Sequence, residues 1–513
     1  MNAEAVLGID LGTSVVKAGI YGFDGAMHAS ASCPLTLSHS GPGRAEQDLD
    51  DFYEAAAAAS RVCLAGGYAP ERIGAVAMVG QMAGVGIVDK DHRPLAAFDS
   101  WLDTRCGDVA DELSRTLGDR ITATAGCAPT ISIGPKMLWW RRHRPDVCRD
   151  AASFVTAAGY VAGRATATVG RSAFIDPSYL HFTSVADVGR AAWDEALVDA
   201  VGVDPDLLPR IVESAEIVGT LTDRAAADFG LRPGVPVAAG CGDTAASALG
   251  AGAARAGQAF DIAGTAAVFG VCLPVFAPDA SDGTLMTMRA ALPGRWYSLA
   301  YVGGAGQVVE WVCREVLGHA SVDPDAYADL AAAASSVPPG SDGVMVSPHF
   351  SGRVAPVSPS MRGSIVGLSA VTGRAHLARA ALEAIAFEYR RYADIARGAA
   401  PDVAVTEIIG TGGGSRLDVW NQIKADVLAT PYRPVVGAES GTRGAAMVAM
   451  AAIGQELPEL EPSAYGPVAR PDPATTAAYA AATESYQRWS ARWAAGYRSE
   501  SALTEHHGTG DTI

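Results

Sequence analysis

The sequence lacks several features that would indicate a membrane protein, a secreted protein or a fold held together by a metal ion. No apolar run reaches the ~18 residues of a membrane span, and the N-terminus, MNAEAVLGIDLG, has no basic segment of the kind that opens a secretory signal. The eight cysteines lie far apart and form no CxxC pair, which argues against a zinc knuckle or a dithiol motif. Scattered cysteines usually fill core positions and suit a reducing compartment, so we expect a cytoplasmic protein.

Basic residues are also scarce. The 39 lysines and arginines are outnumbered by 56 acidic residues, which gives a net charge of −17. An acidic chain repels phosphodiester backbones, so we expect no nucleic-acid partner, and any phosphate site must be local. With 49% apolar residues, the 513-residue chain can bury a large core, which excludes wholesale disorder.

The common nucleotide and hydrolase motifs are missing. There is no GxxxxGK[ST], because the chain has no Gly-Lys pair, and no GxGxxG, HExxH or GxSxG. A P-loop is therefore excluded, and a dinucleotide fingerprint is unsupported. A dehydrogenase remains an alternative that a test of NAD binding would settle.

What the chain does have is a repeated glycine turn. An apolar strand carrying Asp10 ends at Gly12-Thr13-Ser14, and a second strand carrying Asp261 ends at Gly264-Thr265. Two related halves are thus predicted, each beginning with a strand, a Gly-Thr turn and a strand. Backbone amides and hydroxyls in such turns can hold phosphate oxygens, and Asp10 at a strand end can hold Mg²⁺ through waters. The alternative for either turn alone is an ordinary tight turn.

Two further turns follow buried strands. The cluster from Gly410 to Ser415 lies between a predicted strand and a predicted helix, residues 416–428, an arrangement that suits a nucleotide. Asp243 occupies a glycine-flanked turn between a strand and a helix. It is either a helix N-cap or a carboxylate that takes the proton of a substrate hydroxyl as it attacks a γ-phosphate.

A third group suits a polyhydroxylated ligand. Gln81 and Met82 end a buried strand, and Trp101, Asp103 and Arg105 follow in one short segment. An aromatic face beside an acid and an arginine offers stacking and directed hydrogen bonds. The alternative is a surface loop with a half-buried tryptophan.

In this order, these motifs resemble the FGGY carbohydrate kinases, and most closely their xylulokinase-like branch. The resemblance runs from about residue 5 to about residue 455. It rests on Ile9-Asp10-Leu11-Gly12-Thr13-Ser14 with Lys17, Glu46-Gln47-Asp48, Gly80-Gln81-Met82, Trp101-Leu102-Asp103-Thr104-Arg105, Pro135-Lys136-Met137-Leu138-Trp139, Gly242-Asp243-Thr244-Ala245-Ala246, Gly264-Thr265, Ser351-Gly352-Arg353 with Arg362-Gly363, Gly412-Gly413-Gly414-Ser415 and Trp420-Asn421-Gln422 with Ala425-Asp426-Val427.

The resemblance implies an α/β fold of two duplicated actin-like, ribonuclease-H-like domains flanking a deep cleft. We expect an N-terminal domain at 1–252, a C-terminal domain at 253–499 and a flexible tail at 500–513. The resemblance also implies that the γ-phosphoryl group of ATP is transferred, with Mg²⁺, to a hydroxyl of a small sugar or polyol. By analogy alone, it implies a homodimer. No membrane partner is expected.

The same resemblance implies roles for individual residues. Asp243 would be the catalytic base and Asp10 the metal ligand. The sugar would lie against Gln81, Met82, Ala83, Trp101, Asp103 and Thr244. The nucleotide would lie against Thr13, Ser14, Lys17, Gly264, Thr265, Gly412, Gly413, Gly414 and Ser415.

Some positions depart from the xylulokinase pattern. That branch usually carries His where Ala83 stands and Asn where Thr244 stands, and both usual residues contact sugar hydroxyls. Losing such a partner typically costs ~1–3 kcal/mol and changes substrate preference. Residues 172–177 and Ile133 also depart from the family pattern. We therefore expect a kinase of a xylulose-like ketopentose, with a tetritol, pentitol, deoxy-ketose or glycerol kinase as the alternative, and a non-catalytic actin-like ATPase as a further one.

Overall fold

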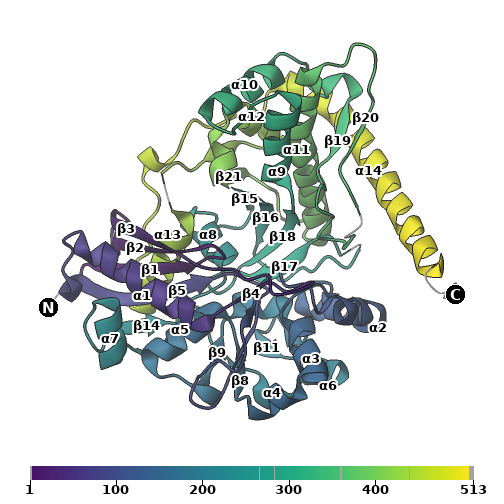
Figure 1. Ribbon diagram of the computed structural model, residues 1–513. Helices are drawn as coiled ribbons and strands as arrows, with labels where there is room; N and C mark the ends of the chain where they lie inside the picture. Colours follow the sequence, from purple (N-terminus) through teal and green to yellow (C-terminus); the bar gives the residue numbers. More distant parts are fainter. Residues whose placement is uncertain (1–2, 265, 282, 359–360, 438, 508–513) are drawn as a thin grey trace.

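Two six-stranded mixed sheets, one in each half of the chain, form the framework of the protein (Figure 1). The computed structural model describes residues 3–264, 266–281, 283–358, 361–437 and 439–507, with side chains up to residue 496. None of the helices in this described part combines the length and apolarity that a membrane crossing needs.

The N-terminal sheet has the strand order β13-β14-β5-β1-β2-β3. Strands β1 to β3 form an antiparallel meander, and β5 and β14 run parallel to β1. The bounds are β1 Ala5–Leu11, β2 Val15–Gly22, β3 Met27–Pro34, β5 Ile73–Gly80, β13 Ile217–Thr220 and β14 Pro236–Ala238. Helices of this half are α1 Leu49–Ala65, α2 Gly107–Ala125, α3 Ile133–His143, α4 Pro145–Asp150, α5 Ala157–Thr166, α6 Glu195–Val201, α7 Asp223–Phe229 and α8 Asp243–Gly250.

The C-terminal sheet repeats this plan. Its order is β17-β18-β16-β15-β21-β22, with β15, β21 and β22 parallel and the remaining pairs antiparallel. Read from the opposite edge, β22-β21-β15-β16-β18 corresponds strand for strand to β14-β5-β1-β2-β3. The bounds are β15 Gln258–Ala263, β16 Ala267–Leu273, β17 Met286–Arg289, β18 Trp296–Val302, β21 Glu407–Thr411 and β22 Tyr432–Pro434. The prediction of two related halves is confirmed.

The remaining elements connect or cover the sheets. Helices of the second half are α9 Ala305–Trp311, α10 Pro324–Ser335, α11 Arg374–Ala399, α12 Asp418–Leu428, α13 Ser440–Ala452 and α14 Pro473–His507. Short strands are β4 Glu46–Gln47, β6 Gly86–Val88, β7 Phe98–Asp99, β8 Ser153–Val155, β9 Phe174–Ile175, β10 Ala186–Asp187, β11 Ala192–Trp193, β12 Arg210–Ile211, β19 Met345–Ser347 and β20 Ser364–Val366. The 3₁₀ turns that matter below are η3 Pro177–Phe182 and η7 Gly413–Arg416.

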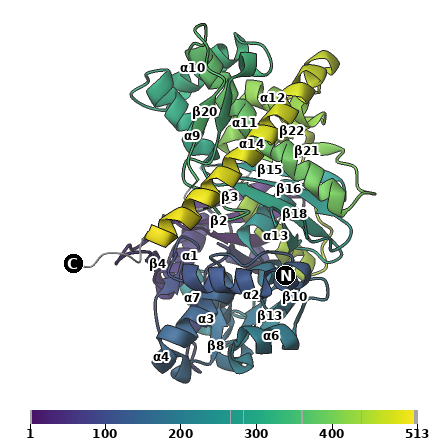
Figure 2. The same cartoon turned by 90° about the vertical axis from the view of Figure 1, so that its right-hand side faces the viewer.

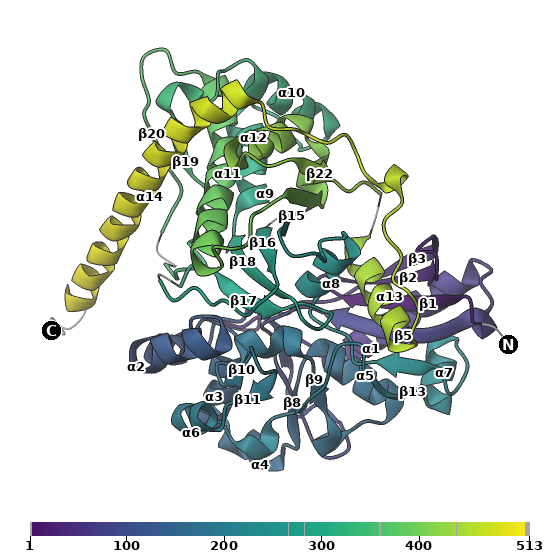
Figure 3. The same ribbon diagram turned by 180° about the vertical axis from the view of Figure 1, so that it is seen from behind.

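Helix α13 connects the two halves. It follows the last strand of the C-terminal sheet but packs against β1, β5 and α8 of the N-terminal half (Figure 3). The contact needs glycine, since a Cβ on Gly8 would lie 2.2 Å from the Thr442 carbonyl oxygen, and one on Gly444 would lie 1.9 Å from that of Ala246. The domain boundary at 252/253 stays a prediction, and α13, from beyond it, belongs by packing to the first sheet.

The C-terminal helix α14 runs along the outside of the second half (Figure 2). Tyr479 and Tyr486 anchor it by donating hydrogen bonds of 2.7 and 2.8 Å to the buried Glu383 and Glu388 of α11. The helix continues to His507, so the predicted flexible tail at 500–513 begins inside it, and residues 508–513 lie outside the described part.

One buried histidine makes stability depend on pH. His181 in η3 is 2% exposed, and burial lowers its pKa from the ordinary 6.5 to about 3. Below pH 6.5 the unfolded chain therefore binds a proton that the folded state refuses, and stability falls as the pH drops toward 3, by up to ~1.4 kcal/mol per pH unit.

We expect His181→Asn to remove the contribution of this histidine to the pH dependence of stability. The free energy of unfolding, measured by urea denaturation from pH 7 to pH 4, should fall less steeply in the variant than in the parent. Parallel curves would show that His181 does not titrate in this way.

Candidate active site

Parallel strands bring the predicted catalytic residues to one edge of the N-terminal sheet. Asp10 pairs with Val79 across β1 and β5, and a bridge joins Gly80 to Gly242 just before α8. Since the carboxyl ends of parallel strands share an edge, ligands in such sheets bind there. Asp10, near the end of β1, thus lies at the same edge as Gln81 and Asp243, which follow β5 and β14.

The carboxyl groups of Asp10 and Asp243 have pKa values above the ordinary value for aspartate. Burial, followed by the charge of Asp243, raises the pKa of Asp10 from 3.8 to about 7, with Lys17 opposing this shift. Burial raises the pKa of Asp243 to about 6, while hydrogen bonds from Thr244 oppose the change. Oδ1 of Asp10 is buried without a hydrogen-bond partner among the described residues. Two buried acids with pKa values raised in this way are typical of a functional site.

Asp243 does not cap its helix. It is the first residue of α8, the N-cap position belongs to Gly242, and no side chain caps this helix end. Its Oδ1 accepts the Thr244 hydroxyl at 3.2 Å, and the Thr244 backbone supplies a further hydrogen bond to the carboxylate. The N-cap alternative is therefore excluded, and the carboxylate keeps acceptor capacity.

A tyrosine of the other half stands beside this pair. Tyr301 of β18 is buried, and after burial the charge of Asp243 contributes to its raised pKa. Tyr301 belongs to no motif in the sequence, and its approach depends on how the halves pack.

Thr13 is tied to the predicted sugar side. The Trp101 indole Nε1 donates to the Thr13 hydroxyl at 2.9 Å, and Gln47 donates to the Thr13 carbonyl at 2.9 Å. An indole N–H can only donate, so the Thr13 hydroxyl accepts from it and its own proton is free for another acceptor. Trp101 is 45% exposed, so an aromatic face is left for a ligand.

Lys17 and Ser14 lie on the same hairpin. Lys17, opposite Asp10 in the sheet, forms a 2.7 Å ion pair with Glu439, directly before α13. Both side chains are roughly half exposed, so the pair adds little to stability. Ser14 is exposed.

The loop after β5 is held from behind. Gln81 is 1% exposed, and its side-chain amide donates to Gln47 at 2.8 Å and accepts from Ser100 at 3.1 Å. Both ends of this amide are therefore bonded to other protein side chains. Met82 packs on Gly242, where a Cβ would lie 2.6 Å from its sulfur. Ala83 has a φ of +61°, a left-handed conformation that is uncommon for alanine.

Lys136, part of the family-like motif but not predicted as a site residue, supports this loop. It is buried, and its ammonium group donates to the carbonyls of Ala83 at 3.0 Å and Ser100 at 2.5 Å. A lysine at the start of a helix gives no signal of such a role in the sequence.

Asp103 is predicted to face the sugar, but the structure gives it another role. It is 1% exposed, both carboxylate oxygens accept from Arg105 at 3.0 Å, and Oδ2 also accepts from the Ala45 amide. Glu46, Asp99 and Asp103 converge in a set that could hold a metal ion, yet Arg105 lies within 2.9 Å of all three. The guanidinium supplies the positive charge, so Asp103 fixes the Trp101 segment.

The glycine turn after β21 packs against the end of β15. Gly412 has a φ of +86°, and a Cβ there would lie 2.5 Å from the Ala263 carbonyl oxygen. No atom lies within 4 Å of the corresponding position on Gly413, so that backbone faces open space. Ser415 donates to the Gly412 carbonyl and closes the turn. The turn therefore lies beside Gly264, whereas Thr265 falls outside the described residues.

Asp261 is not a counterpart of Asp10. It is fully buried, accepts from Tyr389 at 2.7 Å and Tyr432 at 2.8 Å, and pairs with Lys424 at 2.5 Å. Asp10 precedes its Gly-Thr turn by one residue fewer, and a shift of one residue in a strand turns the side chain to the opposite face of the sheet. The acid-Gly-Thr similarity between the two halves is thus limited to the turns.

Helix α13 connects Asp10 to the glycine turn after β21, residues 412–415. A Cβ on Gly441 would lie 2.2 Å from Oδ2 of Asp10, and the neighbouring Ser440 hydroxyl lies 3.4 Å from that of Thr411, directly before Gly412. This contact is not predicted from the sequence, although glycines at 441 and 444 in a helix indicate close packing.

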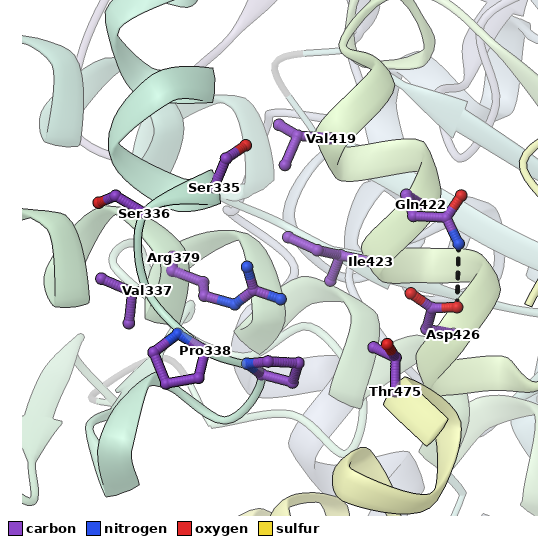
Figure 4. Close-up of a pocket in the computed structure, with 11 residues that line it drawn as sticks. Ser335, Ser336, Val337, Pro338, Arg379, Val419, Gln422, Ile423, Asp426 and Thr475 are labelled. Atoms are coloured by element: carbon purple, nitrogen blue, oxygen red, sulfur yellow. Dashed lines mark hydrogen bonds between the residues drawn. The ribbon is translucent and has the colours of Figure 1, made fainter. Parts of the chain in front are cut away.

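A cavity of about 460 Å³ lies elsewhere, between the residues after α10, helix α12 and the start of α14 (Figure 4). Its charged residues are already engaged, because Arg379 donates to Glu383, Ala334 and Tyr479, and Asp426 accepts from Gln422. None of the predicted site residues lines it.

Gly441 offers a direct test of the site geometry. Gly441→Ala should displace Asp10 or α13 and abolish ATP binding in calorimetry, because the added methyl overlaps the Asp10 carboxylate. Gly398→Ala in α11 is the control, since a Cβ there meets no atom within 4 Å. If Gly441→Ala bound ATP like the parent, the packing of α13 on Asp10 would not matter for the nucleotide.

The chain is similar to known carbohydrate kinases along most of its length. Residues 5–250 match the N-terminal domain, and residues 260–453 the C-terminal domain, of the FGGY family of carbohydrate kinases. Xylulose kinase of Escherichia coli K12 is 29% identical over 94% of this chain and 98% of its own, and glycerol kinase of Dechloromonas aromatica is 31% identical over 88% and 89%. The solved xylulose kinase of Rhodospirillum rubrum has a TM-score of 0.86 at 26% identity, covering 96% of this chain and all of that one. The chain belongs to the FGGY family of carbohydrate kinases.

Proposed function

We propose that the protein transfers the γ-phosphoryl group of ATP to a hydroxyl group of a small sugar or polyol, with Asp243 as the general base. One observation carries this proposal. Asp10, near the end of β1, and Asp243, which follows β14, lie at the carboxyl edge of one sheet with pKa values raised to about 7 and about 6. A carboxylate with a pKa near 6 is ionised at neutral pH and is more basic than an ordinary aspartate.

Asp243 takes the proton of the attacking hydroxyl. Transfer of a phosphoryl group requires mainly alignment and charge neutralisation, because its transition state is loose. Asp243 lies at the first position of α8, where the turn through Gly242 fixes its direction. Thr244 donates to it, and Tyr301 of the other half lies near enough that, after burial, the Asp243 charge raises its pKa.

The carboxylate of Asp10 fits a divalent cation. Mg²⁺ prefers oxygen ligands, and Oδ1 of Asp10 is buried without a partner among the described residues. Asp10 would hold the ion, which supplies charge neutralisation at the phosphates when bound.

The nucleotide lies, in this proposal, between the two Gly-Thr turns. Thr13 directs its free hydroxyl proton to a phosphate oxygen, while Ser14, Lys17 and the backbone around Gly264 and Thr265 supply further donors. Gly412, Gly413, Gly414 and Ser415 hold the adenosine, and the open backbone of Gly413 supports this placement.

A xylulose-like ketopentose is the first candidate for the acceptor, given the relatives named xylulose kinase. Ala83 and Thr244 favour a second candidate, another polyol or sugar of the family's range, such as a tetritol, pentitol, deoxy-ketose or glycerol. Ala83 has no side-chain hydrogen-bonding group, and Thr244 directs its hydroxyl to Asp243. An ADP-release assay across these alcohols distinguishes the candidates.

Asp243→Asn tests the base. We expect kcat to fall about 10²- to 10⁴-fold while the fold and ATP affinity persist, because the amide cannot take the proton. Asp223→Asn is the matched control, since Asp223 is also the first residue of a short helix, α7. Near-parental turnover by Asp243→Asn would exclude the assigned role.

Substrate choice can be tested by restoring the usual pair. In the double variant Ala83→His, Thr244→Asn, we expect the kcat/KM for D-xylulose, divided by that for the best parental alcohol, to rise at least about 30-fold, because two recovered partners at ~1–3 kcal/mol each give at least ~2 kcal/mol. The left-handed backbone at position 83 accepts His at least as readily as Ala. An unchanged ratio would show that other residues select the acceptor.

A further inference from the structure

The 3₁₀ turn η3 and the residue before it contact the strand ends that carry the site. This segment, residues 176–182, has no assigned role, and in the sequence only its first two residues belong to the stretch that departs from the family pattern. Two of its side chains, Ser178 and Tyr179, bond to the backbone that precedes Asp243 and Gln81. The inference below rests on the proposed function of Asp243.

Asp176 and Ser178 form a buried chain of hydrogen bonds. The Ser178 hydroxyl donates to Oδ1 of Asp176 at 2.7 Å and accepts the amide of Gly242 at 2.7 Å. Since a hydroxyl has one proton, the bond to Asp176 commits that proton and directs a lone pair at Gly242. Ser178 is 0% exposed, so water does not compete for the Gly242 amide.

Asp176 is itself fixed by three donors. Oδ2 accepts the Ser178 amide at 3.1 Å and the Ser214 hydroxyl at 2.5 Å, in addition to the bond at Oδ1. The Ser214 carbonyl in turn accepts the amide of Gly240 at 3.0 Å. Both glycines of the turn that leads into Asp243 are therefore bonded to this network.

Tyr179 holds the neighbouring strand to the same turn. Its hydroxyl lies 2.9 Å from the Gly80 carbonyl and 3.2 Å from the Cys241 carbonyl, and donates between them. Gly80 ends β5, directly before Gln81, and the Gly80 amide bonds back to Cys241 at 3.1 Å. The sugar-side loop and the Asp243 turn are thus linked through one buried phenol.

We propose that Asp176, Ser178 and Tyr179 are positioning residues for Asp243, setting the direction of the turn at residues 240–242 and its register against the loop at residues 81–83. They do not touch the reacting atoms. Asp176 and Ser178 act through the amide of Gly242, the residue before Asp243, and Tyr179 acts through the carbonyls of Gly80 and Cys241. A base displaced by about 1 Å can lose on the order of 10²-fold in rate.

Ser178→Ala tests this assignment, with Ser60→Ala as the matched control. Both serines are 0% exposed and each donates one hydroxyl bond, Ser60 to the Phe229 carbonyl at 2.8 Å. We expect Ser178→Ala to lower kcat with the best alcohol by roughly 10- to 100-fold with KM for ATP within about twofold of the parent. Ser60→Ala should change thermal stability by a similar amount and leave kcat unchanged.

Tyr179→Phe gives a second test in case Ser178→Ala does not fold. Its control is Tyr297→Phe, because Tyr297 is also buried and donates to a backbone carbonyl, that of Ala253 at 2.9 Å. The Tyr179 variant should lose kcat and the Tyr297 variant should not. Equal kcat losses in a variant and its control, or no loss in either pair, would overturn the proposal.

Amide hydrogen exchange separates this proposal from the proposed function. In Ser178→Ala the Gly242 amide should exchange at least about tenfold faster, while amides of β1 keep their protection. If the parent phosphorylated none of the alcohols, the function would fail, and faster exchange at Gly242 would still support the positioning. Unchanged exchange at Gly242 would refute it.

Discussion

The burial of two acids, Asp10 and Asp243, at one edge of the N-terminal sheet is the constraint on which the site depends. Asp10 lies at the end of β1 and Asp243 at the start of α8, and burial raises both pKa values. Such a pair costs stability unless a cation or a proton compensates it. Two neighbouring features hold the pair in place. Helix α13 packs against Asp10 through Gly441, and the hydrogen bonds of Asp176 and Ser178 hold the Gly242 amide before Asp243.

Duplication of a five-strand plan explains how one chain makes two different walls. The loop after β5 and the turn after β21 occupy corresponding places in their sheets. The first carries Gln81, Met82 and Ala83 and is supported by buried Lys136, whereas the second is a run of glycines whose backbone approaches the end of β15. One fold thus supplies a side-chain surface in one half and a bare backbone surface in the other.

The sequence predicts the repeated strand-turn-strand plan and the edge position of Asp10, Asp243 and the glycine turns, because these follow from local chain direction. It does not reveal contacts that depend on packing. Tyr301, Gly441 and Lys136 come from elements far away in the chain, and Asp103 reads as a ligand-facing acid until Arg105 is seen to occupy both its oxygens. Asp261 resembles Asp10 in its motif, and only its strand register shows that it faces the core.

The most direct measurement is a crystal structure of the protein with Mg²⁺, a non-hydrolysable ATP analogue and the alcohol it phosphorylates fastest. The account predicts a carboxylate oxygen of Asp243 about 2.6–3.2 Å from the acceptor hydroxyl, with that hydroxyl in line with the γ-phosphorus and Asp10 on the side of the metal. A triphosphate bound away from both acids, with Asp243 facing only protein, would contradict it.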